Sequence, residues 1–371
     1  MEDKRSQKQD QIERIINESF LKPFLDDEGI TDISWDGTEL RLKHNQKGPF
    51  KAERQPDSEE VRALIRKIAD IQEKQFNASE AILDTEIGVF RVNAVHDVVS
   101  DEFGMTFSLR VSRPKLAISS LEELTDENVA MLLKILVQSR SNMTISGATG
   151  SGKTELQKLL VGHMPDDDNI CWIEDTRDSH IKELYPHKHI KSWRTLTDDS
   201  RNRKVRFSDL IATGLRNDPD WLIISETRGD GAADILDAAK SNHSIVTTLH
   251  SKGAAAIPSR FIPLIRQSPT YAYTSDVLIG RQIVDLIKFG VHMIQQKNKD
   301  GEITRYPKEL VEFTGFDENG AQYTYLYRQY TVFDNTRKEY VKKTEYNPLS
   351  EHSKKHLAEY ELLHLLPDVF I

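Results

Sequence analysis

Hydrophobic and polar positions alternate irregularly over the first third of the chain. Residues 11–25 place apolar side chains three and four positions apart, which predicts an amphipathic helix facing a core, with a partner or membrane-surface helix as the alternative. Alternating runs on both sides of Asp36-Gly37 predict a hairpin. Residues 59–74 have a helical pattern, and residues 88–111 have the pattern of two or three strands. Such a mixture is typical of an α+β domain.

Beyond Ser112-Arg113-Pro114 the pattern changes to short apolar strands that alternate with helices. The predicted strands cover residues 143–146, 170–174, 221–225 and 244–250, and the predicted helices cover residues 126–139, 153–162, 208–217 and 231–241. Strands linked in this way form a parallel sheet that is buried on both faces. Ligands of such sheets bind beyond the carboxyl ends of the strands.

Strands return after about residue 285, and an amphipathic helix is predicted near the C-terminus. At 371 residues the chain has room for two domains. The pattern predicts four segments: an N-terminal α+β domain over residues 1–112, a linker over 113–122, an α/β domain over 123–295, and a β-rich extension ending in a helix over 296–371.

Charge and cysteine content narrow the classes of protein. The chain has 59 acidic and 50 basic residues and a net charge of -9, which disfavours a broad surface for coating nucleic acid but leaves room for a local basic groove. Cys171 is the only cysteine, which excludes an intrachain disulfide and a cysteine-rich zinc cluster. No apolar run approaches the roughly 20 residues of a bilayer-spanning helix, and no signal peptide is recognisable. We therefore expect a cytosolic protein.

A glycine-rich segment, GATGSGKTE, follows the first strand of the α/β region and precedes a helix. It satisfies the pattern of a phosphate-binding loop, in which backbone amides and a helix N-terminus bind phosphate groups. We expect Lys153 to reach the β- and γ-phosphates of a nucleotide and the Thr154 hydroxyl to coordinate Mg²⁺. The predicted nucleotide-binding residues of this segment are Gly147, Ala148, Thr149, Gly150, Ser151, Gly152, Lys153, Thr154 and Glu155.

Acidic and imidazole side chains end three further predicted strands. Glu174 and Asp175 follow one strand, Glu226 and Arg228 follow the next, and His250 ends another. Because the carboxyl ends of parallel strands lie at one edge of a sheet, we expect these side chains to gather near the phosphate loop. For each of them taken alone, an exposed charge or a polar strand end is the alternative.

The order and spacing of four segments resemble the secretion ATPase superfamily, the hexameric ATPases of type II and type IV secretion, type IV pili and tight-adherence pili. These segments are GATGSGKT, IEDTRD, DLIATGLRNDPDWLIISETRG and TTLH. The resemblance spans about residues 30–290, is most specific over 143–250, and extends to ITDISWDG, FRVNAV and TFSLRVSRP. It implies an α/β RecA-like P-loop NTPase domain with a parallel sheet, preceded by a smaller α+β domain. It also implies a ring of six subunits, with ATP and Mg²⁺ between the two domains.

The resemblance implies a role for each strand-end residue. Glu174 and Asp175 match the Asp box of the family, Glu226 matches its Walker B element, and His250 matches its His box. Glu226 would polarise the attacking water and contribute with Thr154 to the metal site, while Glu174 would assist or share the catalytic role. His250 would contact the γ-phosphate side. The expected catalytic residues are Lys153, Glu174, Glu226 and His250.

Basic residues of the first domain also match the family. Arg91, Arg110 and Arg113 align with positions that reach the nucleotide from across the cleft, where arginines offset charge that develops on the transferred phosphoryl group. A surface ion pair is the alternative for each of them. Arg216 and Arg228 match as well.

The chain departs from the family pattern in several places. AAKSNHSIVTTLHSKG is shorter than the usual segment, and the tail after residue 300 is longer than the family minimum. The long link at 191–207 contains a basic cluster that could contact a neighbouring subunit or nucleic acid, or form a solvated loop. This cluster comprises Arg201, Arg203, Lys204 and Arg206. The four-cysteine zinc insertion of type II members is missing, which favours the type IV secretion or tight-adherence relatives.

The resemblance implies an ATPase that forms ADP and phosphate and powers a conjugation-type type IV secretion machine or pilus assembly. Its expected partners are five further copies in a homo-hexamer and membrane platform or coupling proteins. The chain would be cytoplasmic and peripherally attached to the inner face of the membrane. A RecA-like nucleic-acid translocase or helicase is the alternative, but the acidic balance and the lack of an aromatic and basic stripe argue against direct nucleic-acid binding. A nucleotide-binding regulatory subunit without turnover is a third possibility.

Overall fold

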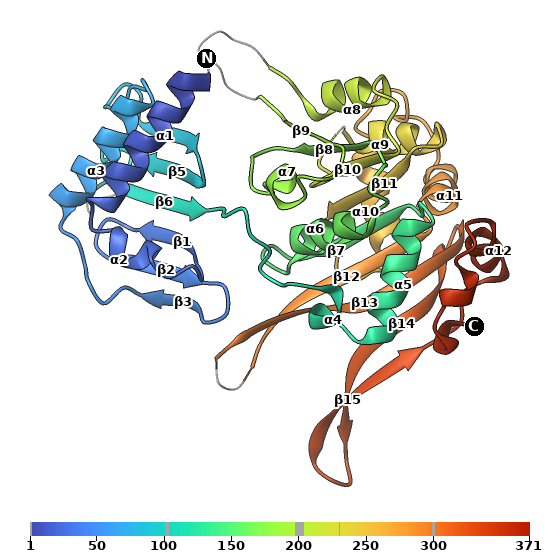
Figure 1. Cartoon of the computed structure of the whole chain (residues 1–371). Helices are drawn as coiled ribbons and strands as arrows, with labels where there is room; N and C mark the ends of the chain where they lie inside the picture. Colours follow the sequence, from blue (N-terminus) through green and yellow to red (C-terminus); the bar gives the residue numbers. More distant parts are fainter. Residues whose placement is uncertain (1, 101–103, 197–203, 230, 299–300) are drawn as a thin grey trace. The chain divides into compact units, whose positions relative to one another are not determined.

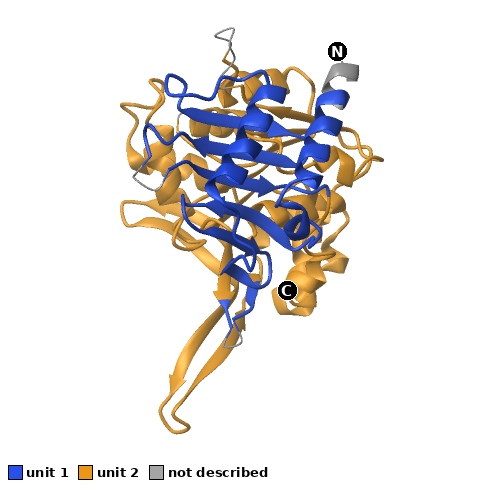
Figure 2. Cartoon of the chain, turned by 90° about the vertical axis from the view of Figure 1, so that its left-hand side faces the viewer, with its two compact units in different colours: residues 1–114, 297–304 blue, residues 115–296, 305–371 orange. Residues whose placement is uncertain are grey.

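The computed structural model of the chain describes residues 2–100, 104–196, 204–229, 231–298 and 301–371 (Figure 1). It divides into two compact units (Figure 2). Unit 1 consists of residues 1–114 and 297–304, and unit 2 consists of residues 115–296 and 305–371. The chain leaves unit 1 after Pro114, inside the linker predicted over 113–122.

Unit 1 is a six-stranded antiparallel sheet with helices on it (Figure 1). Its strands, in the order β3-β2-β1-β6-β5-β4, are β1 (Ile30–Trp35), β2 (Leu40–His44), β3 (Gly48–Lys51), β4 (Ile82–Ile87), β5 (Phe90–Val95) and β6 (Thr106–Val111). The predicted hairpin forms between β1 and β2, where Asp36 accepts the amide hydrogens of Thr38 and Glu39 and Gly37 has φ 104°. This sheet buries the apolar faces of α1 (Glu2–Asn17) and α3 (Ser58–Ile71).

The helix predicted over residues 11–25 is two helices. α1 ends at Asn17, and the short α2 (Lys22–Leu25) starts with Pro23 in its first turn. Between them the Ser19 hydroxyl donates to the Ile16 carbonyl at 2.7 Å and accepts the Leu21 amide hydrogen at 3.1 Å. These bonds replace the backbone bonds of a continuous helix, because a serine hydroxyl competes with the main chain.

Unit 2 contains a nine-stranded mixed sheet in the order β15-β14-β13-β12-β7-β11-β10-β8-β9. Its strands are β7 (Met143–Gly147), β8 (Ile170–Glu174), β9 (Ile190–Arg194), β10 (Trp221–Ile224), β11 (Ser244–Leu249), β12 (Phe289–Lys297), β13 (Ile303–Asp317), β14 (Gly320–Asp334) and β15 (Glu339–Tyr346). The strands from β12 to β9 pair in parallel, which confirms the four predicted parallel strands β7, β8, β10 and β11 and adds β9 and β12, whereas β13, β14 and β15 form antiparallel pairs. The sheet is mixed because the β-rich extension continues it beyond β12.

Helices cover both faces of the parallel part of this sheet. They are α4 (Leu121–Leu124), α5 (Glu127–Gln138), α6 (Lys153–His163), α7 (Ile181–Leu184), α8 (Phe207–Leu215), α9 (Gly231–Lys240), α10 (Ile257–Ile265), α11 (Asp276–Leu286) and α12 (Glu351–Glu359). Within β8, Ile170 and Trp172 belong to the apolar cluster that contains α5 and α6. Cys171 and Ile173 belong to the cluster that contains α8 and α9. Both faces are therefore buried, and polar side chains can emerge only at the strand ends.

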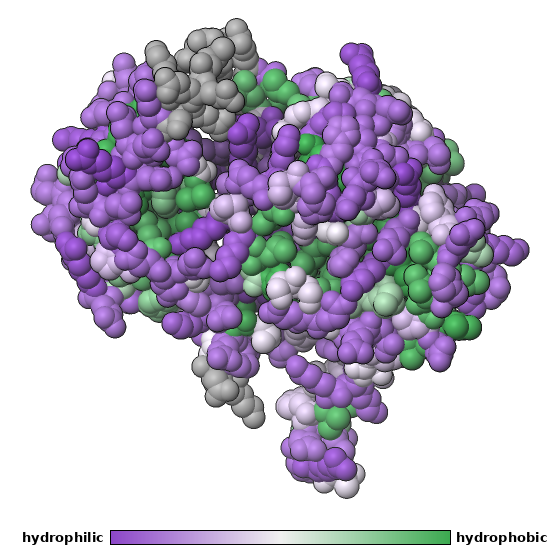
Figure 3. Space-filling model, in the orientation of Figure 1, coloured by the Kyte–Doolittle hydropathy of each residue, from purple (hydrophilic) through white to green (hydrophobic). Residues whose placement is uncertain are grey.

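The surface seen in Figure 3 is mainly hydrophilic, which agrees with a charged fraction of 29%. Among the residues that the structure describes, none of the helices combines the length and the apolar character needed to cross a bilayer.

Candidate functional site

The glycine-rich loop joins the central strand β7 to α6. Gly147, Gly150 and Gly152 have φ values of 151°, 80° and 94°, a region that residues with a Cβ rarely adopt. A Cβ at Gly147 would also lie 2.4 Å from the Met293 carbonyl oxygen on the neighbouring β12. The loop therefore requires glycine at these positions, and Ala148, between the first two of them, is exposed.

Lys153 turns back onto the loop that precedes it. Its ammonium group donates to the carbonyl oxygens of Gly147 at 2.9 Å and Ala148 at 3.0 Å, and the residue is 9% exposed. Burial lowers the pKa of Lys153, while the charge of Glu226 opposes that shift. The Ser151 hydroxyl is buried without a hydrogen-bond partner among the described residues. A buried ammonium and an unsatisfied hydroxyl beside a glycine loop fit a bound phosphate group.

The other P-loop residues surround the start of α6. Thr154 is half-buried in the first turn. The Glu155 carboxylate accepts the Ala117 amide hydrogen and lies 3.5 Å from the Lys158 ammonium. Thr149 is exposed at the rim of the loop.

A connected set of polar side chains runs along the carboxyl edge of the sheet from this loop. His250, after β11, places Nδ1 2.9 Å from the Gly147 carbonyl oxygen and Nε2 3.3 Å from the Glu226 carboxylate. The Arg228 guanidinium joins Glu226 at 2.7 Å to Asp175 at 3.1 Å. The structure brings together four of the five strand-end residues that the sequence predicted to gather, namely Asp175, Glu226, Arg228 and His250.

Electrostatics keep the Glu226 carboxylate ionised. Burial alone would raise its pKa, but Arg228, His250 and Lys153 outweigh burial, so the pKa of Glu226 is lower than usual. A carboxylate beside three cationic or imidazole groups is stabilised in its charged form.

Glu174 lies apart from this set. It is 4% exposed, and its carboxyl oxygens accept the Ser179 amide hydrogen at 3.1 Å and the Ser179 hydroxyl at 3.0 Å. Burial raises the pKa of Glu174 to about 7, against the effect of these hydrogen bonds. The structure therefore brings Asp175 to the network and directs its neighbour into the interior.

Three threonines, not identified as site residues from the sequence, fix the ends of β10 and β11 to each other. The Thr227 and Thr247 hydroxyls are 2.7 Å apart, and the Thr227 amide donates to the Thr248 carbonyl at 2.7 Å. The Thr248 hydroxyl donates to the Ser225 carbonyl at 2.6 Å. These bonds on both sides of Glu226 hold the carboxylate near His250. The sequence feature that could have identified these threonines is their position beside Glu226 and His250, in the segments SETRG and TTLH.

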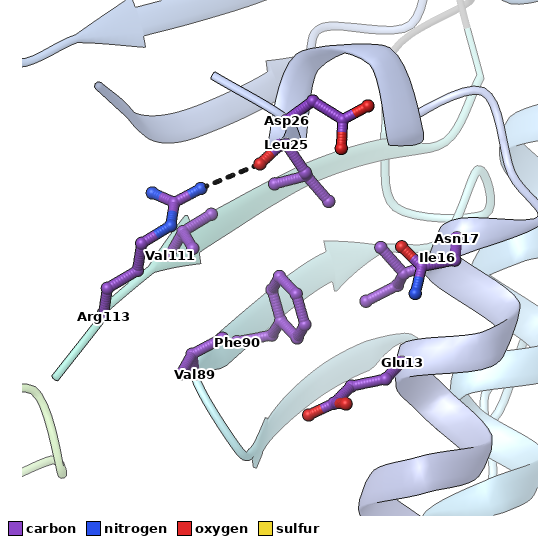
Figure 4. A pocket seen from close by; sticks show the side chains of 9 residues that line it. All are labelled: Glu13, Ile16, Asn17, Leu25, Asp26, Val89, Phe90, Val111 and Arg113. Carbon is purple, nitrogen blue, oxygen red and sulfur yellow. Dashed lines mark hydrogen bonds between the residues drawn. The ribbon is translucent and has the colours of Figure 1, made fainter. Parts of the chain in front are cut away.

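The three arginines expected from the first domain all lie in unit 1. Arg91 lies 3.9 Å from Asp84, and Arg110 lies 3.1 Å from Asp32. Arg113 donates to the carbonyl oxygens of residues 25, 28 and 30 at 3.2, 3.0 and 2.8 Å, and it lines a small pocket with Phe90 (Figure 4). Their approach to a nucleotide stays a prediction.

The basic cluster of the long link is only partly described. Arg201 and Arg203 lie outside the described residues. Lys204 is exposed, and Arg206 forms an ion pair of 3.5 Å with Asp209 at the start of α8.

Comparisons with known proteins identify the family of the chain and match its fold. The family model of the type II/IV secretion system protein matches residues 32–356. An uncharacterized protein of Bacillus anthracis is 32% identical over 82% of this chain and 67% of its own length. A putative conjugal transfer protein of Mycobacterium tuberculosis is 27% identical over 65% of this chain and 70% of its own. The solved structure of the Legionella pneumophila ATPase DotB has a similar fold, with a TM-score of 0.58 at 19% identity over 78% of each chain.

Proposed function

The chain belongs to the type II/IV secretion system protein family, and we propose that it is an ATP-hydrolysing motor of a conjugation-type type IV secretion machine or of pilus assembly. The observation that carries this proposal is the continuous set of contacts from the phosphate loop through His250, Glu226 and Arg228 to Asp175. The name of one similar protein, a putative conjugal transfer protein, supports the same proposal.

The glycine loop is the proposed binding site for the phosphate groups of ATP. The amides of residues 147–155 and the α6 N-terminus supply donors and a favourable dipole for the phosphates. Lys153 already bonds two carbonyl oxygens of the loop, and phosphate oxygens would be better acceptors for its ammonium.

The residues also fit a magnesium ion. Mg²⁺ keeps several waters and needs only one or two protein oxygens in addition to the substrate phosphates, so the Thr154 hydroxyl and the Glu226 carboxylate suffice to hold it. Held there by Thr154 and Glu226, Mg²⁺ would supply positive charge that offsets the negative charge developing on the phosphate groups.

We assign the orientation of the attacking water to Glu226 rather than Glu174. A general base must be ionised and must lie at the reacting edge. The pKa of Glu226 is lower than usual and Arg228 fixes its side chain, whereas the pKa of Glu174 is about 7 and its oxygens are engaged by Ser179.

His250 links the loop to this carboxylate. Its Nδ1 faces the Gly147 carbonyl oxygen and its Nε2 faces the Glu226 carboxylate. Because one ring contacts both the phosphate loop and the carboxylate, we propose that His250 couples binding of the γ-phosphate to the position of Glu226.

We further propose that six copies form a ring at the cytoplasmic face of the membrane, docked on platform or coupling proteins. In that ring Arg91, Arg110 and Arg113 would complete the nucleotide site from the first domain. Family membership supports this arrangement.

A turnover assay tests the proposal directly. Purified protein is expected to release phosphate from ATP when Mg²⁺ is present and to stop when EDTA removes it. Light scattering with a non-hydrolysable ATP analogue is expected to give the mass of six chains. Absence of phosphate release in the presence of Mg²⁺ would reject the motor. Stimulation of hydrolysis by single-stranded DNA that falls steeply with salt would favour a nucleic-acid translocase.

A further inference from the structure

One arginine outside every recognised motif contacts the phosphate loop. Arg305 comes from β13 in the C-terminal extension, 155 positions after Gly150, and its Nε donates to the Gly150 carbonyl oxygen at 2.8 Å. Its aliphatic stem lies over Gly152, because a Cβ at Gly152 would be 3.4 Å from Arg305 Cδ and 3.7 Å from Arg305 Cβ. Both loop glycines and Arg305 belong to unit 2.

The surroundings of Arg305 keep its head group at the loop. Burial lowers the pKa of Arg305, and the negative charge of Glu155 in the first turn of α6 opposes that shift. Glu155 is itself held by the Ala117 amide and by Lys158. An arginine between a carbonyl oxygen and a fixed carboxylate keeps its charge, since its guanidinium does not deprotonate in proteins.

Two cationic side chains therefore bind different carbonyl groups of the same loop. Lys153 binds those of Gly147 and Ala148, and Arg305 binds that of Gly150. Lys153 is expected to move onto the phosphates when a nucleotide enters, whereas the bond of Arg305 is to the main chain.

The Gly150 carbonyl belongs to the same peptide unit as the Ser151 N–H. A hydrogen bond accepted by a carbonyl group polarises its peptide unit and makes the attached N–H a stronger donor. The loop also contains three glycines, whose freedom makes an unrestrained loop costly to order on binding.

We propose that Arg305 is a positioning residue for the nucleotide phosphates: it holds the loop in its binding conformation and strengthens the hydrogen bond that the Ser151 amide donates to the Ala148 carbonyl oxygen, at 3.2 Å, within the loop. This inference rests on the proposed function, because it concerns the same phosphate site. The C-terminal extension would then take part in nucleotide binding. No motif in its sequence predicted such a role.

Loss of Arg305 should weaken the binding of ATP and ADP alike. A loop held by its main chain contacts substrate and transition state equally, and removal of such uniform binding raises KM with little change in kcat. For a charge-assisted hydrogen bond we expect a rise of about 10-fold in KM and in the Kd of ADP.

The test compares three variants of the full chain. Arg305→Met keeps the stem over Gly152 and removes the donor, and Arg305→Lys keeps the charge without the directed N–H. Lys308→Met, on the same strand, is the matched control. KM and kcat are measured by phosphate release, and the Kd of ADP is measured with a fluorescent analogue. We expect KM and the Kd of ADP to rise about 10-fold over the parent chain in Arg305→Met and about 3-fold in Arg305→Lys. Both values should be unchanged in Lys308→Met.

Each outcome decides the inference. Unchanged KM and ADP Kd in Arg305→Met, or a fall confined to kcat, would overturn it. Should Arg305→Met fail to fold in thermal unfolding, Arg305→Lys takes its place, and an unchanged KM in that variant overturns the inference. A parent chain that binds ADP without hydrolysing ATP would reject the proposed motor, while the ADP measurements would still decide the role of Arg305.

Discussion

The His250 imidazole lies 2.9 Å from the Gly147 carbonyl oxygen, although the two residues are 103 positions apart in the chain. The contact follows from the sheet, because β11 pairs directly with β7 and both strands end at the same edge. The other ring nitrogen lies 3.3 Å from the Glu226 carboxylate. One side chain thus connects the first residue of the phosphate loop to the proposed catalytic carboxylate.

Replacement of His250 by glutamine should separate binding from chemistry. Glutamine can bond one of the two acceptors but cannot present two N–H groups in opposite directions. We expect ATP binding to be retained and kcat to fall about 10- to 100-fold. Phosphate release and analogue binding measure the two effects, and His352→Gln on the exposed side of α12 is the control. If His250→Gln instead lost affinity for ATP and ADP equally, the role of His250 would be to position the phosphate loop.

Removal of the Lys153 ammonium should abolish detectable hydrolysis and weaken ATP binding. Lys153→Ala deletes the ammonium group that bonds the Gly147 and Ala148 carbonyl oxygens, and loss of a preorganised charge at a phosphoryl group costs about 100-fold or more in rate. Steady-state phosphate release measures the effect. Lys182→Ala, at an exposed position of α7, should behave as the parent chain. Retained turnover in Lys153→Ala would refute the assigned site.

The two candidate carboxylates can be separated by paired amide variants. Glu226→Gln should bind ATP and slow hydrolysis by about 100-fold or more, because it removes the ionised carboxylate at the reacting edge. Glu174→Gln keeps the shape of the buried side chain and should stay within about 3-fold of the parent kcat if its task is to bond Ser179. Single-turnover measurements with excess enzyme give the chemical step directly. Normal turnover in Glu226→Gln would move the catalytic role to Glu174.

Sequence periodicity predicted much of this arrangement because the deciding signals were local. The glycine loop, its preceding strand and its following helix occupy consecutive residues, and the strands that carry Glu226 and His250 are short apolar runs buried on both faces. Parallel pairing then brings their ends together without further information. The same reasoning could not predict that Glu174 is buried while Asp175 contacts Arg228.

The separation of these two neighbours depends on the strand's period of two. Glu174 falls on the side of Trp172, which packs in the cluster of α5 and α6, and Asp175 continues the side of Ile173. Which side faces the site depends on how the helices cover the sheet. Contacts such as Arg305 with Gly150 are still less visible, because they depend on the extension joining the sheet next to β12.

The buried Glu174 carboxyl should make stability depend on pH. Its pKa is raised from 4.5 to about 7, so the folded chain binds this proton more tightly than the unfolded chain. The resulting stabilisation is complete below about pH 4.5 and is lost as the pH rises through about 7, an effect of roughly 3 kcal/mol. Urea unfolding should therefore show a larger decrease in the free energy of unfolding between about pH 5 and pH 8 for the parent chain than for Glu174→Gln. The exposed Glu359→Gln is the control, and parallel losses in all three chains would contradict the assignment.

The C-terminal helix should depend on one buried carboxylate. Glu312 of β13 is 2% exposed and accepts the Ser350 amide hydrogen at 2.8 Å, the Ser350 hydroxyl at 2.5 Å and the Ser353 hydroxyl at 2.5 Å. Ser350 is the N-cap of α12, so the carboxylate also faces the positive end of the helix. Glu312→Ala leaves three donors without this acceptor, one of them the buried Ser353 hydroxyl, and we expect a loss of roughly 2–4 kcal/mol in the free energy of unfolding.

Limited proteolysis shows whether this loss is local to α12. Trypsin should cut Glu312→Ala faster than the parent chain at Lys354 and Lys355, because α12 leaves the sheet before the rest of unit 2 unfolds. Glu318→Ala, at an exposed turn of the same hairpin, supplies the control. Ser353→Ala removes a single donor and should cost about 1 kcal/mol, and its effect should largely disappear in the Glu312→Ala background. Additive losses in that double variant would mean that Ser353 and Glu312 stabilise the helix independently.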